Sequence, residues 1–318
     1  MKSSTKISLE KLGPPGIPGH LVIVDKLKGD TRTDQEQLRD QSERMFHVTA
    51  ILSKTPLLDE DIDLSLAVER GGSYINASPD AVTSLIKTSL GNITLSHNSH
   101  RELARIEFEC AAASQIGALG LFHTAVSPFL DHISYLANVP IHLARTECMD
   151  KKNNVHFYDY INPHPHVTLN PHEARIFTRV LPLYALYREA KNSGSPFYRF
   201  LCYYKILEGT YAHIRPEFFL EARTRAVKVV TEKEVVPDHE ELRFSHGDQI
   251  GKSIKTVFDN RFTPQFRDEI AHYLLSDGAV LNVSDFNAVR RFGGELLAIE
   301  LCARTVIGVQ ERYEAQLG

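Results

Sequence analysis

The sequence has no hydrophobic run close to the roughly 20 apolar residues that a membrane-spanning helix requires. Residues 1–6 lack the apolar core of a secretory signal. Cysteine is scarce, and its four positions are scattered in apolar surroundings without a CxxC pair: Cys110, Cys148, Cys202 and Cys302. We therefore expect a cytoplasmic protein with reduced core cysteines, no membrane partner, and neither a disulfide framework nor a cysteine-based zinc site.

Neither half of the chain has the basic excess that a broad nucleic-acid-binding surface requires. Residues 1–169 carry 16 Lys+Arg and 20 Asp+Glu, whereas residues 170–318 carry 20 of each. Any contact with RNA should therefore be confined to a small site. A Gly-rich phosphate loop is also missing, because Gly71-Gly72-Ser73 lacks the lysine and the following helix of such a loop.

The length of 318 residues favours two domains. Residues 1–19, which end in a run of Gly and Pro, are predicted to be a flexible segment, and residues 20–165 an α+β domain. Strands are expected at residues 21–24, 46–52, 62–68, 93–96, 139–144 and 155–161, with a polar loop over residues 25–41. Ala104, Phe108 and Ile116 keep helical spacing, which predicts a helix within residues 101–137. Ser127-Pro128 should end that helix and begin another.

Residues 170–318 are predicted to form an all-α, up-down bundle of four or five amphipathic helices. Helix starts are expected where a capping side chain directly precedes proline: Asn170-Pro171, Ser195-Pro196 and Thr263-Pro264. The first of these helices should bury Ile176, Val180, Leu183 or Tyr184, and Tyr187. The helix from Pro196 should end at Arg215-Pro216, where proline blocks continuation. Further elements are a loop or hairpin over residues 222–245, a short helix over 249–258, and a terminal helix from Ser284 or Asp285 to about Glu314. The terminal helix should bury a long apolar stripe that includes Leu296 and Ile299.

The residues that most clearly indicate a catalytic role are Arg267-Asp268, followed by His272. It resembles the active-site motif of HEPN-type ribonucleases, in which Asp, Asn or His usually follows the arginine. Asp268 and His272 stand at positions i and i+4, so on a helix they share a face and the acid could orient the imidazole. For so short a motif the alternative is a surface Arg and His on an amphipathic helix.

Residues 200–208 resemble the aromatic helix, with a glutamate (here Glu208), found early in HEPN domains. The chain is similar to the bacterial subgroup labelled MauJ-like or ApeA-like, and the HEPN likeness covers residues 172–318. It implies a homodimer that cleaves RNA without a metal or other cofactor, in stress or anti-phage defence, with the N-terminal domain as a sensor or regulator. His272 would transfer protons, Arg267 would stabilise charge on the phosphorane, and Asp268 and Glu208 would support them.

Two other functions remain open on the sequence. One is a non-catalytic HEPN-like module for dimerisation or for binding RNA, a nucleotide or a protein; the other is an uncharacterised MauJ-like accessory protein. Some HEPN toxins are silenced by nucleotide transfer to a Tyr two residues after the His. Here that position is Leu274, with Tyr273 directly after the His, which puts this regulation in doubt.

Other groups of reactive residues give weaker signals. A histidine cluster could bind a metal, although a polar linker rich in Pro and Asn is the favoured interpretation: His156, His164, His166 and His172. Ser127 and Cys110 have no partner histidine at a recognisable spacing, so they predict no nucleophilic triad.

Overall fold

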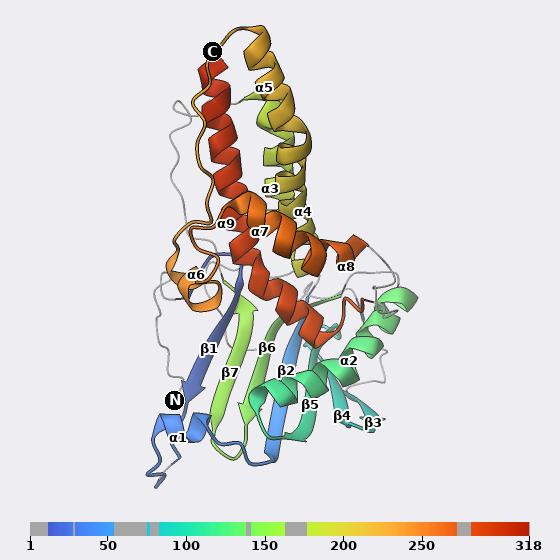
Figure 1. The fold of residues 1–318 in the computed structure, drawn as a ribbon. Coiled ribbons are helices and arrows are strands. Elements are labelled where there is room, and N and C mark those ends of the chain that lie inside the picture. The colour runs from blue at the N-terminus through green and yellow to red at the C-terminus, as the bar shows by residue number, and fades with distance from the viewer. Residues whose placement is uncertain are drawn as a thin grey trace. The chain divides into compact units, whose positions relative to one another are not determined.

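The computed structural model describes residues 12–27, 29–53, 75–76, 83–137, 141–162, 177–271 and 281–317 (Figure 1). The chain divides into two compact units. The first, the sheet unit, comprises Met1–Pro165 together with Ser284–Asn287. The second, the helical unit, comprises His166–Val283 and Ala288–Gly318. Each unit is described by itself.

The sheet unit is built on one antiparallel sheet with the strand order β1-β7-β6-β2-β5-β4-β3. The strands are β1 (Pro18–Val24), β2 (Arg44–Ser53), β3 (Thr83–Thr88), β4 (Gly91–His97), β5 (Leu103–Ala112), β6 (His142–Asp150) and β7 (Val155–Ile161). Every neighbouring pair in this order is antiparallel. The α+β character expected for this part of the chain is therefore observed.

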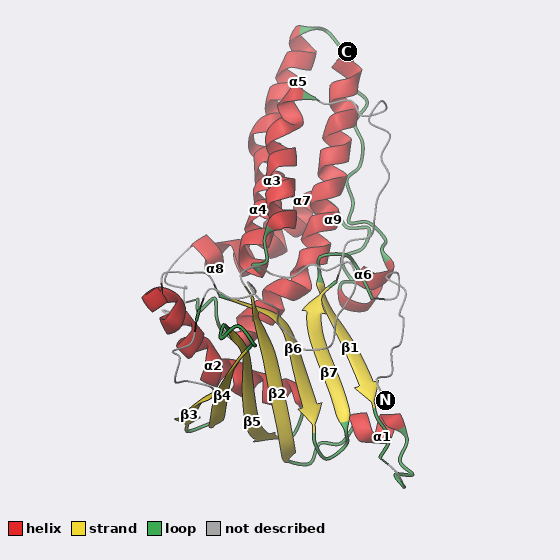
Figure 2. Ribbon diagram, turned by 180° about the vertical axis from the view of Figure 1, so that it is seen from behind, coloured by secondary structure: helices red, strands yellow, loops and turns green. Residues whose placement is uncertain are grey.

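One face of the sheet is covered by helix α2 (Gln115–Ala137). Phe46 and Val48 of β2 and Phe108 of β5 have no exposed surface, and they pack with Phe122 and Val126 of α2. Alternate strand residues point to the same face, which is why these positions form one apolar layer. Figure 2 shows the opposite face of the sheet, over which none of the helices that the structure describes in this unit lies.

Several strand predictions are confirmed. Residues 155–161 coincide with β7, and β2 and β4 contain the stretches predicted at 46–52 and 93–96. The first strand begins at Pro18, earlier than predicted, because it is an edge strand in which proline is tolerated. The strand expected from residue 139 is β6, which begins at His142 and runs to Asp150. The strand predicted at 62–68 lies outside the described residues.

The helix predicted from residue 101 is wrong over its first turns, which form strand β5. Ala104, Phe108 and Ala112 are four residues apart, a spacing that fits one face of a helix and one face of a strand equally well. The intervening residues distinguish a strand from a helix. Ile106 and Cys110 are buried too, so the buried residues alternate with a period of two, as in a strand.

The helix boundary predicted at Ser127-Pro128 is also wrong, because Pro128 lies inside α2. Proline removes the amide that would bond to the Thr124 carbonyl. Both residues lie on the exposed side of the helix, where water can satisfy that carbonyl. The apolar side continues through Phe122, Val126 and Leu130 and holds the two halves of the helix against the sheet.

The polar loop predicted over residues 25–41 contains a short helix, α1 (Asp34–Leu38). A capping box starts it: the Glu36 amide donates to Thr33 Oγ1, and the Thr33 amide donates to Glu36 Oε2 at 2.6 Å. The Thr-x-x-Glu pattern was present in the sequence, so this helix could have been predicted.

The helical unit contains a series of helices, some of them contiguous. They are η2 (Thr178–Val180), α3 (Leu181–Asn192), α4 (Pro196–Gly209), η3 (Thr210–Ile214), α5 (Arg215–Thr224), α6 (Glu240–Ser245), α7 (Ile254–Val257), η4 (Phe258–Arg267), α8 (Asp268–Ala271) and α9 (Phe286–Leu317). Segments η3 and η4 are π-helical. They join α4 to α5 and α7 to α8 without a break in the helix.

An aromatic cluster forms the centre of this unit. Phe200 of α4 contacts Phe262 and Phe266 of η4, with ring centroids 5.9 and 5.3 Å apart. Phe292 of α9 lies 5.6 Å from Phe200 and 5.2 Å from Phe266. Edge-to-face pairs at these distances are favourable beyond the area they bury. The cluster therefore fixes η4, which carries Arg267, against α4 and α9.

Two helix-start predictions in this unit are confirmed. Ser195 caps α4, since its Oγ accepts from the Tyr198 amide at 3.4 Å, and proline follows at the first helical position. Helix α9 begins at Phe286, next to the predicted start, and continues to Leu317. Its buried residues include Leu296 and Ile299, as the apolar stripe predicted.

The other proline signals were misleading. The helix predicted to end at Arg215-Pro216 continues through η3 into α5, in which Pro216 is the second residue. Thr263-Pro264 does not start a helix either. It lies inside η4, where Thr263 Oγ1 donates to the Phe258 carbonyl at 2.9 Å instead of capping. Arg267 therefore lies 13 residues after Ile254, where this continuous helical segment begins, and not in the first turns of a new helix.

The remaining predictions for this half are met only in part. Asn170-Pro171 and Ile176 lie outside the described residues, and Phe177 is extended (φ −101°, ψ 120°), so the helix containing Tyr187 begins after it. The loop predicted over residues 222–245 ends in helix α6. The short helix expected from residue 249 begins at Ile254, as α7.

Candidate functional site

Arg267 is the last residue of the π-helical segment η4. Its neighbour Phe266 is buried in the aromatic cluster, whereas the side chain of Arg267 is 32% exposed. Arg267 Nη1 donates to Asp268 Oδ1 at 3.0 Å, and this bond raises the pKa of the guanidinium further above its ordinary range. The side chain is therefore positively charged, partly accessible and anchored on one side. π-Helical turns occur often at functional sites.

Asp268 is the first residue of α8, and its side chain is 46% exposed. It pairs with Arg267, its direct neighbour. The structure thus places two of the predicted site residues together. His272 lies outside the described residues, so the predicted pairing of Asp268 with the imidazole stays a prediction.

Glu208 lies near the end of α4 and is 32% exposed, not buried. Its Oε2 accepts from Lys205 Nζ at 2.5 Å, one turn earlier on the same helix. The negative charge of Glu208 also contributes to the raised pKa of Arg267, after the larger effect of Asp268. Glu208, Asp268 and Arg267 therefore share one electrostatic environment on the helical unit.

Tyr204 explains why α4 and η4 meet at this place. Its ring stacks on Phe258, with centroids 4.9 Å apart, and its hydroxyl lies 3.2 Å from Thr263 Oγ1. Tyr204 is only 3% exposed. From the sequence, Tyr204 was predicted to belong to an aromatic helix and Thr263 to a helix cap, and no contact between the two was predicted.

The arrangement of these side chains can stabilise a bound anion. A partly exposed guanidinium held by one carboxylate keeps donors for a phosphate group. Glu208 and Asp268 both have cationic partners, which favours a positioning role for them over proton transfer. A proton-transferring group would have to come from His272.

The histidine cluster is represented in the structure by His156 alone, since His164, His166 and His172 lie outside the described residues. His156 belongs to β7, and its Nδ1 lies 2.6 Å from Glu147 Oε1. This hydrogen bond raises the pKa of His156. Across the described part of the chain, no group of three or more His, Cys, Asp or Glu side chains could hold a metal ion.

The four cysteines are buried and unbridged: Cys110, Cys148, Cys202 and Cys302. Burial raises the pKa of Cys110 to about 11 and that of Cys302 to about 12, so neither thiol ionises readily. This agrees with their prediction as core residues. Among the described residues, no helix is long and apolar enough to cross a membrane.

The sequence analysis missed a set of buried charged residues in α9. Glu300 accepts hydrogen bonds from Tyr187 at 2.8 Å and from Tyr203 at 3.1 Å, and it pairs with Lys191 at 2.7 Å. Glu295 pairs with Arg261 and with His246. Both carboxylates interrupt the apolar stripe of α9 on its inward side, where the stripe alone indicated only apolar contacts.

Comparison with known proteins gives one match. The model of a family described as methylamine utilization protein MauJ matches residues 183–308. The C-terminal region is therefore MauJ-like. The match covers less than half of the chain, and it includes Glu208, Arg267, Asp268 and His272. Neither the curated proteins nor the solved structures contain a significant match.

Proposed function

We propose that the helical unit is a HEPN-like, metal-independent endoribonuclease with Arg267 and His272 as its catalytic residues. The observation that supports this best is the state of Arg267. It is a charged, partly exposed guanidinium at the end of a π-helical segment. The neighbouring Phe266 packs in the aromatic cluster and fixes that segment. The MauJ-like match spans both residues.

The proposed reaction needs no cofactor. His272 removes the proton from a ribose 2′-hydroxyl, the 2′-oxygen attacks the adjacent phosphorus, and the bond to the 5′-oxygen breaks. The leaving 5′-oxygen takes a proton from an imidazole. Arg267 stabilises the negative charge that develops on the phosphorane oxygens. The products are a 2′,3′-cyclic phosphate and a 5′-hydroxyl end.

Asp268 and Glu208 are positioning residues in this proposal. Asp268 holds one nitrogen of Arg267, which restricts the directions in which the remaining donors can point. The charge of Glu208 favours the protonated form of the guanidinium, and Lys205 holds the Glu208 carboxylate in an ion pair. A second copy of the chain would complete the site, with residues 20–165 as the regulatory domain and residues 170–318 as the nuclease domain. The role would be stress or anti-phage defence.

The ion pair between Arg267 and Asp268 also favours a second candidate function. A guanidinium that a neighbouring carboxylate neutralises attracts phosphate less strongly. This fits a non-catalytic module that dimerises or binds RNA, a nucleotide or a protein. An RNA-cleavage assay separates the two candidates.

The test is incubation of the purified full chain with total RNA in the presence of EDTA. Variants Arg267→Ala and His272→Ala are compared with Arg312→Ala, which removes an exposed arginine paired with Glu232. The proposal predicts cleavage by the unmodified protein and by Arg312→Ala, and loss with both site variants. Equal RNA integrity in all samples and in the protein-free blank would exclude a constitutive nuclease and favour the binding module.

A further inference from the structure

A buried charged cluster joins three helices of the helical unit. Glu295 of α9 accepts two bonds from Arg261 of η4, at 2.5 and 3.1 Å. Its Oε1 also lies 3.1 Å from Nε2 of His246, the residue that follows α6. Glu295 is 6% and His246 is 5% exposed. Burial raises the pKa of Glu295, but the bonds from His246 and Arg261 outweigh it, so the net pKa is below its ordinary value and the carboxylate is ionised.

The position of the carboxylate fixes the tautomer of His246. A carboxylate can only accept, so the hydrogen of the neutral ring must be on Nε2. Nδ1 then carries a lone pair and acts as an acceptor. The hydroxyl of Ser245 lies within hydrogen-bond distance of it, with 2.8 Å between Oγ and Nδ1.

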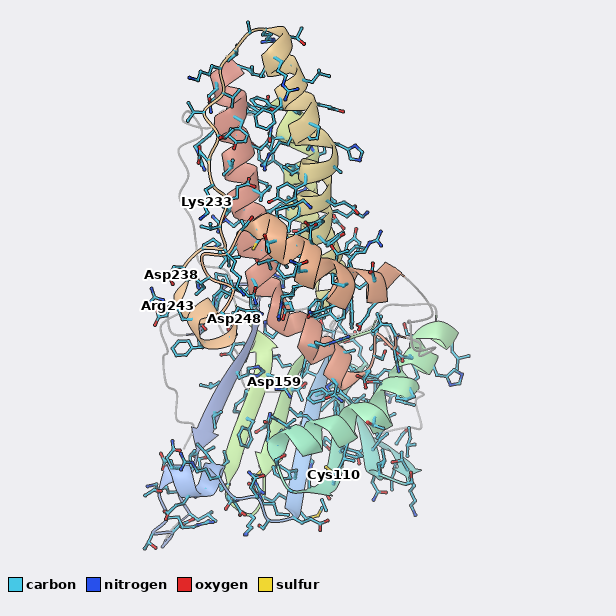
Figure 3. The ribbon with its side chains drawn as sticks, in the orientation of Figure 1. Cys110, Asp159, Lys233, Asp238, Arg243 and Asp248 are labelled. Atoms are coloured by element: carbon cyan, nitrogen blue, oxygen red, sulfur yellow. The ribbon has the colours of Figure 1, made fainter. Side chains whose placement is uncertain are left out.

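Ser245 differs from its two partners in being exposed. It is the last residue of α6, and Figure 3 shows this short helix with Arg243 and the nearby Asp238 and Asp248 labelled. Ser245 Oγ can also bond the Glu241 carbonyl, but that contact is longer, at 3.2 Å. The hydroxyl therefore faces solvent on one side and a buried base on the other.

The turn after His246 supplies backbone donors. The amides of Gly247 and Asp248 make no hydrogen bond to any other residue that the structure describes. Glycine is required at 247, because a Cβ there would lie 2.9 Å from the Arg243 carbonyl oxygen. The tight turn thus leaves two N–H groups, two and three positions after the serine, as candidate donors to an oxyanion.

We propose that Ser245, His246 and Glu295 form a nucleophilic triad that hydrolyses small carboxylic esters. His246 Nδ1 takes the proton of Ser245 as Oγ attacks the ester carbonyl carbon, and Glu295 holds the ring. The tetrahedral intermediate collapses, the C–O bond to the alcohol breaks, and the alcohol leaves with the proton from Nδ1. Water, deprotonated by the same nitrogen, then releases the acid and restores Ser245.

The exposed position of Ser245 selects the substrate class. A small ester can reach it from solvent, and the side chain of Phe244 beside it is 85% exposed and apolar. This site uses none of the residues proposed for RNA cleavage. Its activity should therefore survive in Arg267→Ala, and Ser245→Ala should leave any RNA cleavage unchanged.

The test treats the full chain with a fluorophosphonate probe and, separately, with p-nitrophenyl acetate. The expected result is a covalent adduct on the peptide that contains Ser245, and ester hydrolysis reduced at least roughly 100-fold in Ser245→Ala. The matched control is Ser253→Ala, whose side chain makes no capping bond to its helix, and this variant should react as the unmodified protein does. Circular dichroism checks the fold of each variant.

A further variant, Glu295→Gln, should slow labelling at Ser245 without removing the serine. Should this variant unfold, the comparison of Ser245→Ala with Ser253→Ala tests the proposal by itself. Because Ser245 is exposed, its substitution should leave the fold intact. Absence of an adduct on Ser245, or equal ester hydrolysis by Ser245→Ala and the unmodified protein, overturns the proposal.

Discussion

Tyr203 of α4 donates a hydrogen bond to Glu300 of α9, with 3.1 Å between the phenol oxygen and Oε2. Tyr203 has no exposed surface and Glu300 is 6% exposed. Lys191 and Tyr187 of α3 bind the other carboxylate oxygen. One carboxylate therefore links three helices of the helical unit and accepts from two tyrosine hydroxyls and a lysine ammonium.

Glu300→Ala should destabilise the helical unit strongly. The change leaves the buried hydroxyl of Tyr203, the half-buried hydroxyl of Tyr187 and the ammonium of Lys191 without their acceptor, which typically costs about 3 kcal/mol or more. The measurement is urea unfolding of the full chain followed by circular dichroism. Glu232→Ala is the control, because Glu232 forms an exposed pair with Arg312 that should contribute about 1 kcal/mol or less. Equal effects of the two substitutions would argue against the linking role of Glu300.

Pro128→Ala should stabilise the sheet unit. The substitution restores an amide to the interior of α2 and removes a poor helix former at an exposed position. Interior proline costs roughly 3 kcal/mol relative to alanine, and part of that cost should be recovered, about 1–2 kcal/mol. A thermal melt of both proteins measures the change. A lower melting temperature for the alanine variant would mean that proline is needed for the shape of the helix.

The pair of Glu147 and His156 should make the stability of the sheet depend on pH. The hydrogen bond between the two side chains raises the pKa of His156 above the ordinary 6.5. Burial raises the pKa of Glu147, but the bonds from His156 and Tyr158 more than compensate, so the net pKa falls below 4.5. The His156 contribution is complete below pH 6.5 and is lost as pH rises through its folded-state pKa; the Glu147 contribution is lost as pH falls through its own.

His156→Gln tests this dependence. The melting temperature of the unmodified protein should exceed that of the variant by more at about pH 6 than at about pH 9, because raising the pH through the pKa of His156 removes the charge of the imidazolium. A difference that stays constant or grows with pH would show that His156 acts only through packing.

The buried thiols should resist alkylation in the folded protein. Burial raises the pKa of Cys110 to about 11, so little thiolate forms at neutral pH, and Cys302 is also fully enclosed. Iodoacetamide at about pH 8 should therefore modify all four cysteines only after unfolding in urea, as intact-protein mass spectrometry can count. Fast reaction in the native state would place a thiol at an accessible site.

Elements with one consistent periodicity could be predicted from the sequence. The long stripe through Leu296 and Ile299 predicted α9, and strand β7 was located to the residue. Prediction failed where two signals were compatible with the same residues. Ala104 and Phe108 have a spacing that fits both a helix and a strand, and pairing with β2 and β4 decides for the strand.

Proline was the second source of error. Thr263-Pro264 has the composition of a helix start, but the aromatic cluster around Phe262 and Phe266 holds the helix together through it. Tertiary packing here outweighs the local cost of proline, which a single sequence does not show. The motif at Arg267 could be found because it is local. The triad at Ser245 could not, because Glu295 is 50 positions away in the chain.

Arg267 and His272 are the residues proposed to cleave RNA without a metal. The most direct measurement is the chemistry of the ends produced from a short defined RNA in EDTA, read by mass spectrometry. The account predicts 2′,3′-cyclic phosphate and 5′-hydroxyl ends that disappear in Arg267→Ala and persist in Arg312→Ala. An uncut RNA, or ends that carry a 5′-phosphate, would contradict it.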